Sequence, residues 1–361
     1  MFKYFAVAGI IILILIMANH PIFGGTIKGK RLERIKKSPN YKDGVFQNLS
    51  LTPSLAEGFT MRKVLWEFLT DKTPNKVPNK KIPSTKTDLK NQKLGDNFLV
   101  WMGHSSYYFQ LSGKRFLVDP VLSGNASPIP GTTKSFAGTD LYTTDDFPEI
   151  DFLIISHDHY DHLDYKTIKE LKPKIKTVIC GLGVGAHFER WGFDENQIIE
   201  LDWYDNRNLA DDFKITSTPA RHFSGRLFKR NTTLWSSYVL ESPGKKIFIG
   251  GDSGYDIHFK KIGETFGPFD WAILENGQYN EKWKYIHTLP EEFGKVVNDL
   301  NAKNIFPVHS GKFALAQHAW NEPLQKVKQN SLGKNYRLCT PMIGEKLNLD
   351  DESQTFSEWW K

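Results

Sequence analysis

The sequence predicts a mixed α/β fold, because short strand-like runs alternate with helix-like segments along much of the chain. The runs at residues 152–155 and 246–249 are apolar and end at polar or glycine-rich turns, as buried strands do. A helix-like segment at 164–171 begins at an aspartate, a preferred helix cap, and ends just before a proline. Hydrophobic residues make up 40% of the chain and charged residues 24%, which is typical of a globular protein with a large core.

Residues 1–24 are predicted to form a membrane anchor. Phe5 to Ala18 is an unbroken apolar run, somewhat shorter than the roughly 20 residues of a comfortable bilayer span. A cleaved signal peptide is the alternative, but cleavage after Ala18 would leave Ile16 at a position that requires a small residue. We therefore expect an uncleaved anchor, with the side of the membrane left open. A cleaved N-terminus would make the protein secreted or periplasmic.

Residues 25–96 are predicted to form a basic leader. Residues 1–95 carry 17 Lys and Arg against 6 Asp and Glu, whereas the rest of the chain carries 30 against 35. This uneven charge favours contact with an anionic membrane surface and argues against nucleic-acid binding by the acidic remainder. Apolar residues at roughly helical spacing between Ser54 and Leu69 predict one amphipathic helix that packs against the core. A lysine-rich extended segment is expected after it, at 72–96.

Residues 97–361 are predicted to form the catalytic domain. Further strands are expected at 98–101, 107–111, 115–118, 176–180, 213–218, 234–240, 271–274 and 303–308, and further helices at 183–191 and 290–300. The two cysteines, Cys180 and Cys339, lie far apart in the sequence and form no C-x-x-C pair. Neither a disulfide framework nor a thiolate metal site is therefore indicated.

Residues 156–164 read S-H-D-H-Y-D-H-L-D and directly follow a predicted buried strand. Imidazole and carboxylate groups are the usual protein ligands of zinc and its neighbours in the first transition row. His157 and His159 are two residues apart, so in an extended chain they point the same way and can share one ion. Asp161 and His162 can face a second ion after a turn. This stretch therefore predicts a metal centre.

Three later residues also follow predicted strands and can join this centre. They are His222 in P-A-R-H-F-S-G, Asp252 in G-G-D-S-G-Y and His309 in V-H-S-G. Each is weak evidence by itself, because a single histidine is most often structural. Together with the motif they offer seven imidazole and carboxylate groups, enough for two ions. The sequence contains no G-x-S-x-G motif and no Cys–His pair that would indicate a side-chain nucleophile.

The H-x-H-x-D-H signature resembles that of the metallo-β-lactamase-fold hydrolases. The resemblance implies a four-layer αββα sandwich and two metal ions, for which zinc is the expected element. It assigns His157, His159 and His222 to one ion, Asp161, His162 and His309 to the other, and Asp252 to a bridging position. The implied reaction is hydrolysis by a metal-bridging hydroxide, which Asp161 would also orient.

A longer series of motifs is similar to the N-acyl-phosphatidylethanolamine-hydrolysing phospholipase D branch of these hydrolases. It covers about residues 97–325 and includes W-M-G-H-S, V-D-P, I-S-H-D-H-Y-D-H-L-D-Y, E-L-D-W, F-G-P-F-D and Y-I-H-T-L-P-E-E. The resemblance implies a membrane lipid as substrate, and it brings His104 and Asp119 near the metals. It also implies an active-site histidine outside the metal shell, His287, which we expect to act as a proton donor. The sequence does not determine the oligomeric state, and a homodimer is one of the possibilities.

Two departures from this pattern leave the lipid specificity open. The chain has a charged Glu275 and a polar Gln278 where the mammalian lipases are more apolar. A lactonase resembling the ascorbate-phosphate lactonases is one alternative, and a non-catalytic metal protein tethered to the membrane is another. The basic leader favours the lipid substrate over a soluble lactone, and the seven intact ligand positions favour an enzyme over a scaffold.

Overall fold

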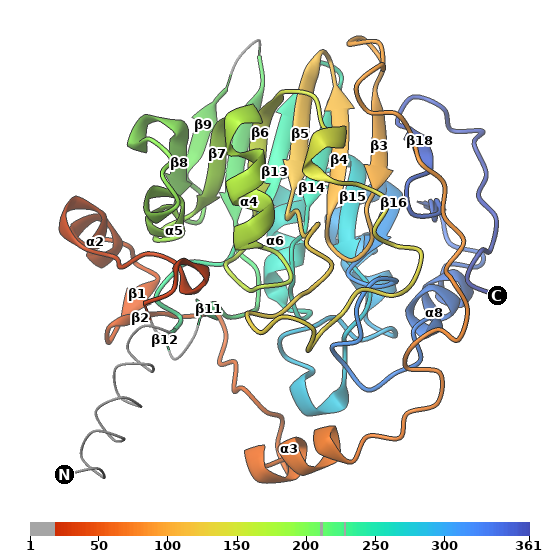
Figure 1. The fold of residues 1–361 in the computed structure, drawn as a ribbon, viewed down its shortest axis with the longest axis horizontal. Helices are drawn as coiled ribbons and strands as arrows, with labels where there is room; N and C mark the ends of the chain where they lie inside the picture. Colours follow the sequence, from red (N-terminus) through yellow and green to blue (C-terminus); the bar gives the residue numbers. More distant parts are fainter. Residues whose placement is uncertain (1–18, 210–211, 227–228) are drawn as a thin grey trace, which may run out of the picture.

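The computed structural model describes residues 19–209, 212–226 and 229–361, which fold around two large β-sheets (Figure 1). The first sheet has the strand order β18-β3-β4-β5-β6-β7-β8. Its strands are β3 (Phe98–Trp101), β4 (Tyr107–Leu111), β5 (Lys114–Val118), β6 (Ile150–Ile155), β7 (Ile175–Gly181), β8 (Ile198–Leu201) and β18 (Lys346–Asn348). The pairs from β5 to β8 are parallel, and the pairs from β18 to β5 are antiparallel.

The second sheet has the strand order β17-β16-β15-β14-β13-β10-β9. Its strands are β9 (Asn206–Asn208), β10 (Lys214–Thr218), β13 (Ser237–Ser242), β14 (Lys245–Ile249), β15 (Phe269–Glu275), β16 (Ala302–Val308) and β17 (Arg337–Leu338). The pairs from β14 to β17 are parallel, whereas β9, β10, β13 and β14 pair antiparallel. Because β10 and β14 both run opposite to β13, the carboxyl ends of β10, β14, β15 and β16 lie at the same edge of the sheet.

Aromatic side chains fill the space between the two sheets. The rings of Phe109 and Phe116 stack with centroids 4.5 Å apart, and Phe213, next to β10, packs against Phe116 at 5.7 Å. The outer face of the first sheet is covered by α4 (Tyr165–Leu171) and α5 (Gly185–Arg190). Helices α6 (Ile257–Phe266), α7 (Phe293–Leu300) and α8 (Glu322–Asn330) cover the second. The predicted mixed α/β sandwich of the metallo-β-lactamase type is therefore confirmed.

The elements around the motif agree with the prediction. Asp164 caps α4 by accepting hydrogen bonds from the backbone N–H groups of Lys166 and Thr167, and Pro173 lies just beyond the end of this helix. Strands β13 and β14 form the predicted hairpin around the turn at Pro243. Helices α6 and α8 have no counterpart among the predicted elements.

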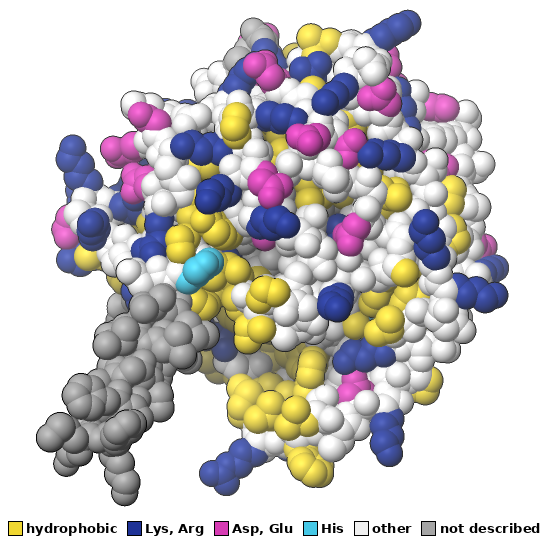
Figure 2. Space-filling model, in the orientation of Figure 1, with side chains coloured by type: hydrophobic (Ala, Val, Ile, Leu, Met, Phe, Trp, Pro, Cys, Tyr) yellow, Lys and Arg dark blue, Asp and Glu magenta, His cyan; other side chains and the backbone are white. Residues whose placement is uncertain are grey.

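The leader contains two helices rather than the one predicted. Helix α2 (Gly29–Lys36) lies in a stretch of the basic leader for which no helix was predicted. Helix α3 (Met61–Leu69) begins after its cap Thr60 rather than at Ser54. The prediction that this helix packs against the core is wrong, because no residue of α3 is buried. Figure 2 shows hydrophobic side chains gathered over α3 at the lower edge of the molecule.

Helix α2 is fixed to the sandwich by Arg31. Its guanidinium pairs with Glu189 at 2.6 Å and with Glu200 at 2.7 Å. The Glu200 carboxylate also accepts hydrogen bonds from the backbone N–H groups of Gly183 and Gly185, ahead of and at the start of α5. The leader is therefore joined to the outer face of the first sheet by a buried, charge-assisted contact.

Residues 1–18 of the predicted anchor, 1–24, lie outside the described residues, and so does its whole apolar run, 5–18. Within the three described ranges, no helix is both long and apolar enough to cross a bilayer. The small two-stranded sheets β1 (Tyr41–Lys42) with β2 (Val45–Phe46) and β11 (Gly225–Arg226) with β12 (Lys229–Arg230) complete the strands of these ranges.

Candidate metal centre

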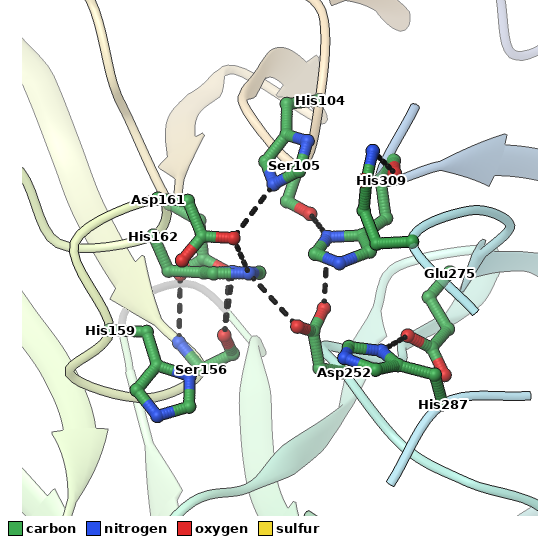
Figure 3. A network of polar contacts seen from close by, with 12 residues as sticks. His104, Ser105, Ser156, His159, Asp161, His162, Asp252, Glu275, His287 and His309 are labelled. Carbon is green, nitrogen blue, oxygen red and sulfur yellow. Dashed lines mark hydrogen bonds and ion pairs between the residues drawn. The ribbon is translucent and has the colours of Figure 1, made fainter. Parts of the chain in front are cut away.

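All seven predicted ligands lie together at one edge of the sandwich, where the carboxyl ends of strands from both sheets meet. Figure 3 shows His159, Asp161, His162, Asp252 and His309 among them. The loop after β6 and the turns after β10, β14 and β16 supply them. In chain order they are His157, His159, Asp161, His162, His222, Asp252 and His309. The structure therefore brings together what is separated by more than a hundred residues in the sequence. Their function as metal ligands stays a prediction.

Three histidine nitrogens form the first group of donors. Nε2 of His157 lies 2.8 Å from Nδ1 of His159, which lies 3.3 Å from Nε2 of His222. One donor atom from each of these residues can therefore reach the same ion. This is the set of three that the family resemblance assigns to one metal.

The second group consists of Asp161, His162 and His309, and it also includes His104. Oδ2 of Asp161 lies 3.5 Å from Nε2 of His162. The same His162 atom lies 3.2 Å from Oδ2 of Asp252, and Oδ1 of Asp252 lies 3.1 Å from Nδ1 of His309. The predicted second set of donors is thus also close together.

Asp252 lies between the two groups. Its Oδ2 atom is 3.9 Å from Nε2 of His157 and 3.8 Å from Nε2 of His222, in addition to its contacts with His162 and His309. A carboxylate that lies close to donors of both groups has the placement expected of a bridging ligand.

Neighbouring groups fix the ring orientation of the histidines. Nδ1 of His162 lies 2.8 Å from Asp119, whose carboxylate also accepts hydrogen bonds from the backbone N–H and hydroxyl of Ser156. Nδ1 of His222 donates to the carbonyl of Ile286 at 2.8 Å. Metal-binding histidines are commonly held through their second nitrogen in this way, which leaves Nε2 directed at the centre.

His104 contacts two of the predicted ligands, Asp161 and His309, through its side chain and its backbone carbonyl. Its Nε2 lies 2.9 Å from Oδ2 of Asp161, and its carbonyl accepts hydrogen bonds from the Trp101 indole and from the backbone N–H of His309. The hydrogen-bonded structural interpretation of His104 fits these contacts. His104, Asp119 and His309 all have left-handed backbone angles, with φ of 52°, 41° and 69°. Such angles are costly for non-glycine residues and gather at functional sites.

The donor set fits divalent metal ions. Burial lowers the pKa of His157, His222 and His309 well below the usual value, so that these imidazoles are neutral and able to ligate. Burial opposes ionisation of Asp161 and Asp252, but the neighbouring His162 outweighs it and holds the pKa of both carboxyls well below the usual range.

Two further observations indicate that the space between His162 and Asp252 favours a bound cation. Burial disfavours a charged His162, yet the carboxylates of Asp252 and Asp161 outweigh it and raise the pKa of His162 well above the usual value. Nε2 of His162 and Oδ1 of Asp252 are also buried without a hydrogen-bond partner among the described residues. Metal ions between these atoms would satisfy both the charge and the donor valences.

His287 lies beside the centre and is held by Glu275, as Figure 3 shows. Nδ1 of His287 is 2.7 Å from Oε2 of Glu275, whose other oxygen accepts a hydrogen bond from the N–H of Thr288. Burial raises the pKa of Glu275 to about 7. Burial opposes charge on His287, but Glu275 outweighs it and raises the pKa of His287. The pair is therefore suited to holding a proton next to the predicted metals.

A cavity of about 220 Å³ opens onto the centre. Five predicted ligands line it, namely His159, Asp161, His222, Asp252 and His309. His287 lines the same cavity, together with Arg230, Trp283 and Met61 of α3. Five predicted ligands, the predicted proton donor and two leader residues, Ser54 and Met61, thus share a single space.

The two polar residues that depart from the lipase pattern support the site. Glu275 is buried and bound to His287 and Thr288. Gln278 is also buried; its amide donates to the carbonyl of Phe313 and accepts from the N–H of Leu315. The sequence identified both as unusual but could not assign these roles, since their partners lie 12 residues or more away.

Comparison with known proteins agrees with this architecture. A model of the family described as beta-lactamase superfamily domain matches residues 114–310. An uncharacterized protein of Mycobacterium tuberculosis is 34% identical over 331 residues, which are 90% of this chain and 88% of the relative. The N-acyl-phosphatidylethanolamine-hydrolyzing phospholipase D 1 of Caenorhabditis elegans is 34% identical over 250 residues, which are 64% of this chain and 69% of the relative. A solved metallo hydrolase from Ignicoccus hospitalis shares the fold with a TM-score of 0.52 and 21% identity, covering 70% of this chain and 97% of that one.

Proposed function

Since the chain belongs to the beta-lactamase superfamily and is a metal-dependent hydrolase of the metallo-β-lactamase fold, we propose that it cleaves a phosphodiester bond of a membrane phospholipid. N-acyl phosphatidylethanolamine is the proposed substrate, because a relative with 34% identity is named for its hydrolysis. The observation that carries the proposal is that His287, held by Glu275, lies in one cavity with five of the predicted ligands.

The seven predicted ligands would hold two divalent ions, for which zinc is the proposed metal because nitrogen and carboxylate donors are present without a thiolate. When bound, such ions lower the pKa of a coordinated water and neutralise negative charge on a phosphate group. His104 holds Asp161, and Asp119 holds His162, so the chain keeps these donors in place before substrate arrives.

His287 is the proposed proton donor to the leaving oxygen. Glu275 accepts from Nδ1 of His287, so Nε2 is the nitrogen that can transfer a proton within the cavity. In the proposed reaction the OH of water is added to phosphorus, and the bond from phosphorus to the ethanolamine oxygen breaks. That oxygen takes the proton of His287, and the remaining proton of the water returns to the imidazole. The products are phosphatidic acid and an N-acylethanolamine.

The size of the cavity is compatible with a lipid headgroup. Pockets that enclose a whole drug-sized ligand measure about 300–1,000 Å³, whereas this cavity measures about 220 Å³. It therefore has room for the phosphodiester and its neighbours but not for several acyl chains. In the proposed complex these chains lie outside the cavity. The apolar run 5–18 and the basic leader are proposed to keep the protein at the membrane that supplies such a substrate.

Hydrolysis in water enriched with oxygen-18 tests the proposal. Purified protein with a measured zinc content is incubated with vesicles containing N-acyl phosphatidylethanolamine, and the products are analysed by mass spectrometry. We expect one labelled oxygen in phosphatidic acid and none in the N-acylethanolamine, because the P–O bond breaks. Label in the ethanolamine product, release of a fatty acid, or turnover of lactones but of no phosphodiester would contradict the proposal.

A further inference from the structure

Helix α3 is an amphipathic helix that turns its apolar face away from the protein. Leu65 is 59% exposed, Trp66 67% and Leu69 75%, and Met61 and Phe68 are exposed as well. Of its nine residues, only Val64 and Glu67 are partly buried. A surface helix of a soluble protein normally shows the opposite arrangement, with its apolar stripe on the core.

Polar contacts hold the helix in this orientation. The Glu67 carboxylate pairs with Lys282 at 2.5 Å, and the carbonyl of Glu67 accepts a hydrogen bond from the Gln317 amide. The Lys282 ammonium also donates to the Gln317 side chain. The polar side of α3 is therefore fixed to the sandwich by these contacts. Because the helix is held in this way, its apolar side faces the solvent.

The exposed face continues into the entrance of the catalytic cavity. Met61, the first residue of α3, lines the cavity together with Ser54 and Trp283. Leu51 is 90% exposed and Leu49 47%, so the segment before α3 also presents apolar side chains to the solvent. Figure 2 shows hydrophobic side chains gathered over α3, with Lys and Arg side chains nearby. Single exposed hydrophobic residues are common, but a contiguous group of this kind marks a contact site.

Charge identifies the kind of partner. Arg62 and Lys63 are exposed on α3 itself, and residues 1–95 carry 17 Lys and Arg against 6 Asp and Glu. An apolar face bordered by cations is the pattern of a helix that lies in the interface of an anionic bilayer. The cavity has room for a headgroup only, so acyl chains need an apolar surface at its entrance. Helix α3 provides both the cations that suit an anionic bilayer and an apolar surface for the acyl chains.

We propose that α3, together with Leu49 and Leu51, docks the protein on an anionic lipid bilayer and places the cavity entrance at the headgroup level. This inference deepens the proposed function, because it names where the acyl chains of the substrate lie during hydrolysis. It does not depend on turnover for its test, since docking can be measured in the absence of any reaction.

A fluorescent probe on α3 tests the docking directly. Cys180 and Cys339 are buried, so a nitrobenzoxadiazole label can be directed to an introduced cysteine in the full chain. Leu69→Cys places the label on α3, and Leu332→Cys, at a residue that is 68% exposed and beyond the end of α8, is the matched control. The labelled proteins are reconstituted with vesicles of seven parts dioleoyl phosphatidylcholine to three parts dioleoyl phosphatidylglycerol.

We expect the emission at position 69 to shift to the blue and to be quenched by lipids with a spin label in the acyl chain, while position 332 shows neither change. Two results would overturn the inference. One is a blue shift that depends on protein concentration without vesicles, which would indicate a second copy of the chain on this face. The other is a blue shift already present in dilute protein and unaffected by vesicles, which would indicate that the chain covers the face itself.

Kinetics provide a second, independent readout. In Leu65→Ser/Leu69→Ser, the rate on vesicle lipid at low lipid concentration should fall about tenfold or more, because two exposed leucines no longer enter the bilayer. Hydrolysis of dissolved bis(p-nitrophenyl) phosphate by the same preparation reports on the metal site. An undiminished rate on vesicles overturns the docking inference. Absence of lipid hydrolysis in the unmodified protein refutes the proposed function and leaves the probe measurement valid.

Discussion

At the level of single residues, the histidines of the centre differ in what holds their second nitrogen. A carboxylate holds His162 and a backbone carbonyl holds His222, and both direct Nε2 at the other donors. His287 is held by a carboxylate as well, but its ring stacks on His309 and lines the cavity, and the family resemblance assigns it to neither ion. A ring with this placement can give up a proton without releasing a metal ligand.

His287→Ala should therefore keep the metal content of the unmodified protein and lower kcat on a lipid substrate by about 10²–10⁴, the usual range for a lost general acid. The loss should shrink for a nitrophenyl phosphodiester, because a nitrophenolate leaves without a proton. Elemental analysis and parallel kinetics on both substrates provide the measurement. Normal turnover of the lipid, or loss of metal together with activity, would refute the role.

Glu275→Gln is the matched variant for this pair, because glutamine retains the shape and its one oxygen can still accept from Nδ1 of His287, although its NH2 group then faces the N–H of Thr288. We expect kcat to fall about tenfold, in the range found when the partner of a site histidine is replaced, and KM and metal content to change little. A loss as large as that of His287→Ala would mean that Glu275 acts on the substrate rather than through His287.

His309 belongs to only one of the two donor groups, while Asp252 contacts both. His309→Ala should abolish hydrolysis and reduce the metal content from two ions toward one, with the fold retained. Elemental analysis together with the far-ultraviolet circular dichroism spectrum would check this. If the variant keeps both ions and full turnover, His309 is not a ligand.

At the level of helices and strands, the sequence predicted the elements that carry the site better than those of the leader. Strands such as β6 and β16 are short apolar runs that end at a functional residue, and both are found. Helix α3 shows equally clear apolar periodicity, but periodicity alone does not say whether water, lipid or protein faces the apolar side. Helix α2 was missed because six of its eight residues from Gly29 to Lys36 are charged or glycine, which is too weak an apolar signal before Arg31 pairs with distant Glu200.

The Arg31 contact should be the main attachment of α2. Its side chain is 12% exposed and that of Glu200 8%, so Arg31→Ala leaves a buried carboxylate without its cation. Removal of one partner of a buried ion pair costs about 3–5 kcal/mol; we expect the lower end, because Gly183 and Gly185 still donate to Glu200.

Lys36→Ala is the control for this prediction, since Lys36 forms an exposed pair with Glu33 on the same helix and should cost less than about 1 kcal/mol. Denaturant unfolding of the three proteins measures both values. Equal stabilities of the two variants would show that α2 is not held by the Arg31 contact.

At the level of the whole molecule, hydrogen bonds connect the N-terminal part of the chain to the loop after β6, which carries His157 to His162. The N–H of Gly25 donates to Nδ1 of His187, and Nε2 of His187 lies 3.1 Å from Asp158, the residue between His157 and His159. The guanidinium of Arg226 links the carbonyl of Ile22 to that of Asp158 in the same region. The segment that is proposed to sit at the membrane is thus two contacts away from the predicted metal ligands.

The apolar run and the basic residues of the N-terminal part should contribute to membrane binding in different ways. Burial of residues 5–18 in a bilayer does not depend on charge screening, so the full chain should remain in the membrane fraction after a wash at about 1 M salt. Immunoblotting of washed membranes and determination of the mature N-terminus provide the test. A mature protein beginning at Asn19 would replace the anchor by a signal peptide.

The predicted metal centre lies between the two halves of the sandwich, because the loop after β6 belongs to the first sheet and the turns after β10, β14 and β16 belong to the second. Without cations, the buried carboxylates of Asp161 and Asp252 are compensated by neighbouring histidines, of which His162 contributes most to both. Ions that bind only the folded chain raise its free energy of unfolding by about 4 kcal/mol when their free concentration is about a thousandfold above Kd. For a chain of this size, that corresponds to about 5–10 °C in Tm.

Removal of the metals by dialysis against a chelator should therefore lower Tm by this amount, and addition of zinc should restore it. Differential scanning fluorimetry with parallel elemental analysis measures both. His309→Ala, which lacks one donor of the second group, should show a smaller shift on chelation than the unmodified protein. If Tm is unchanged although the ions are gone, the metals do not link the sheets, and the orphaned donors His162 and Asp252 must be stabilised by the protein alone.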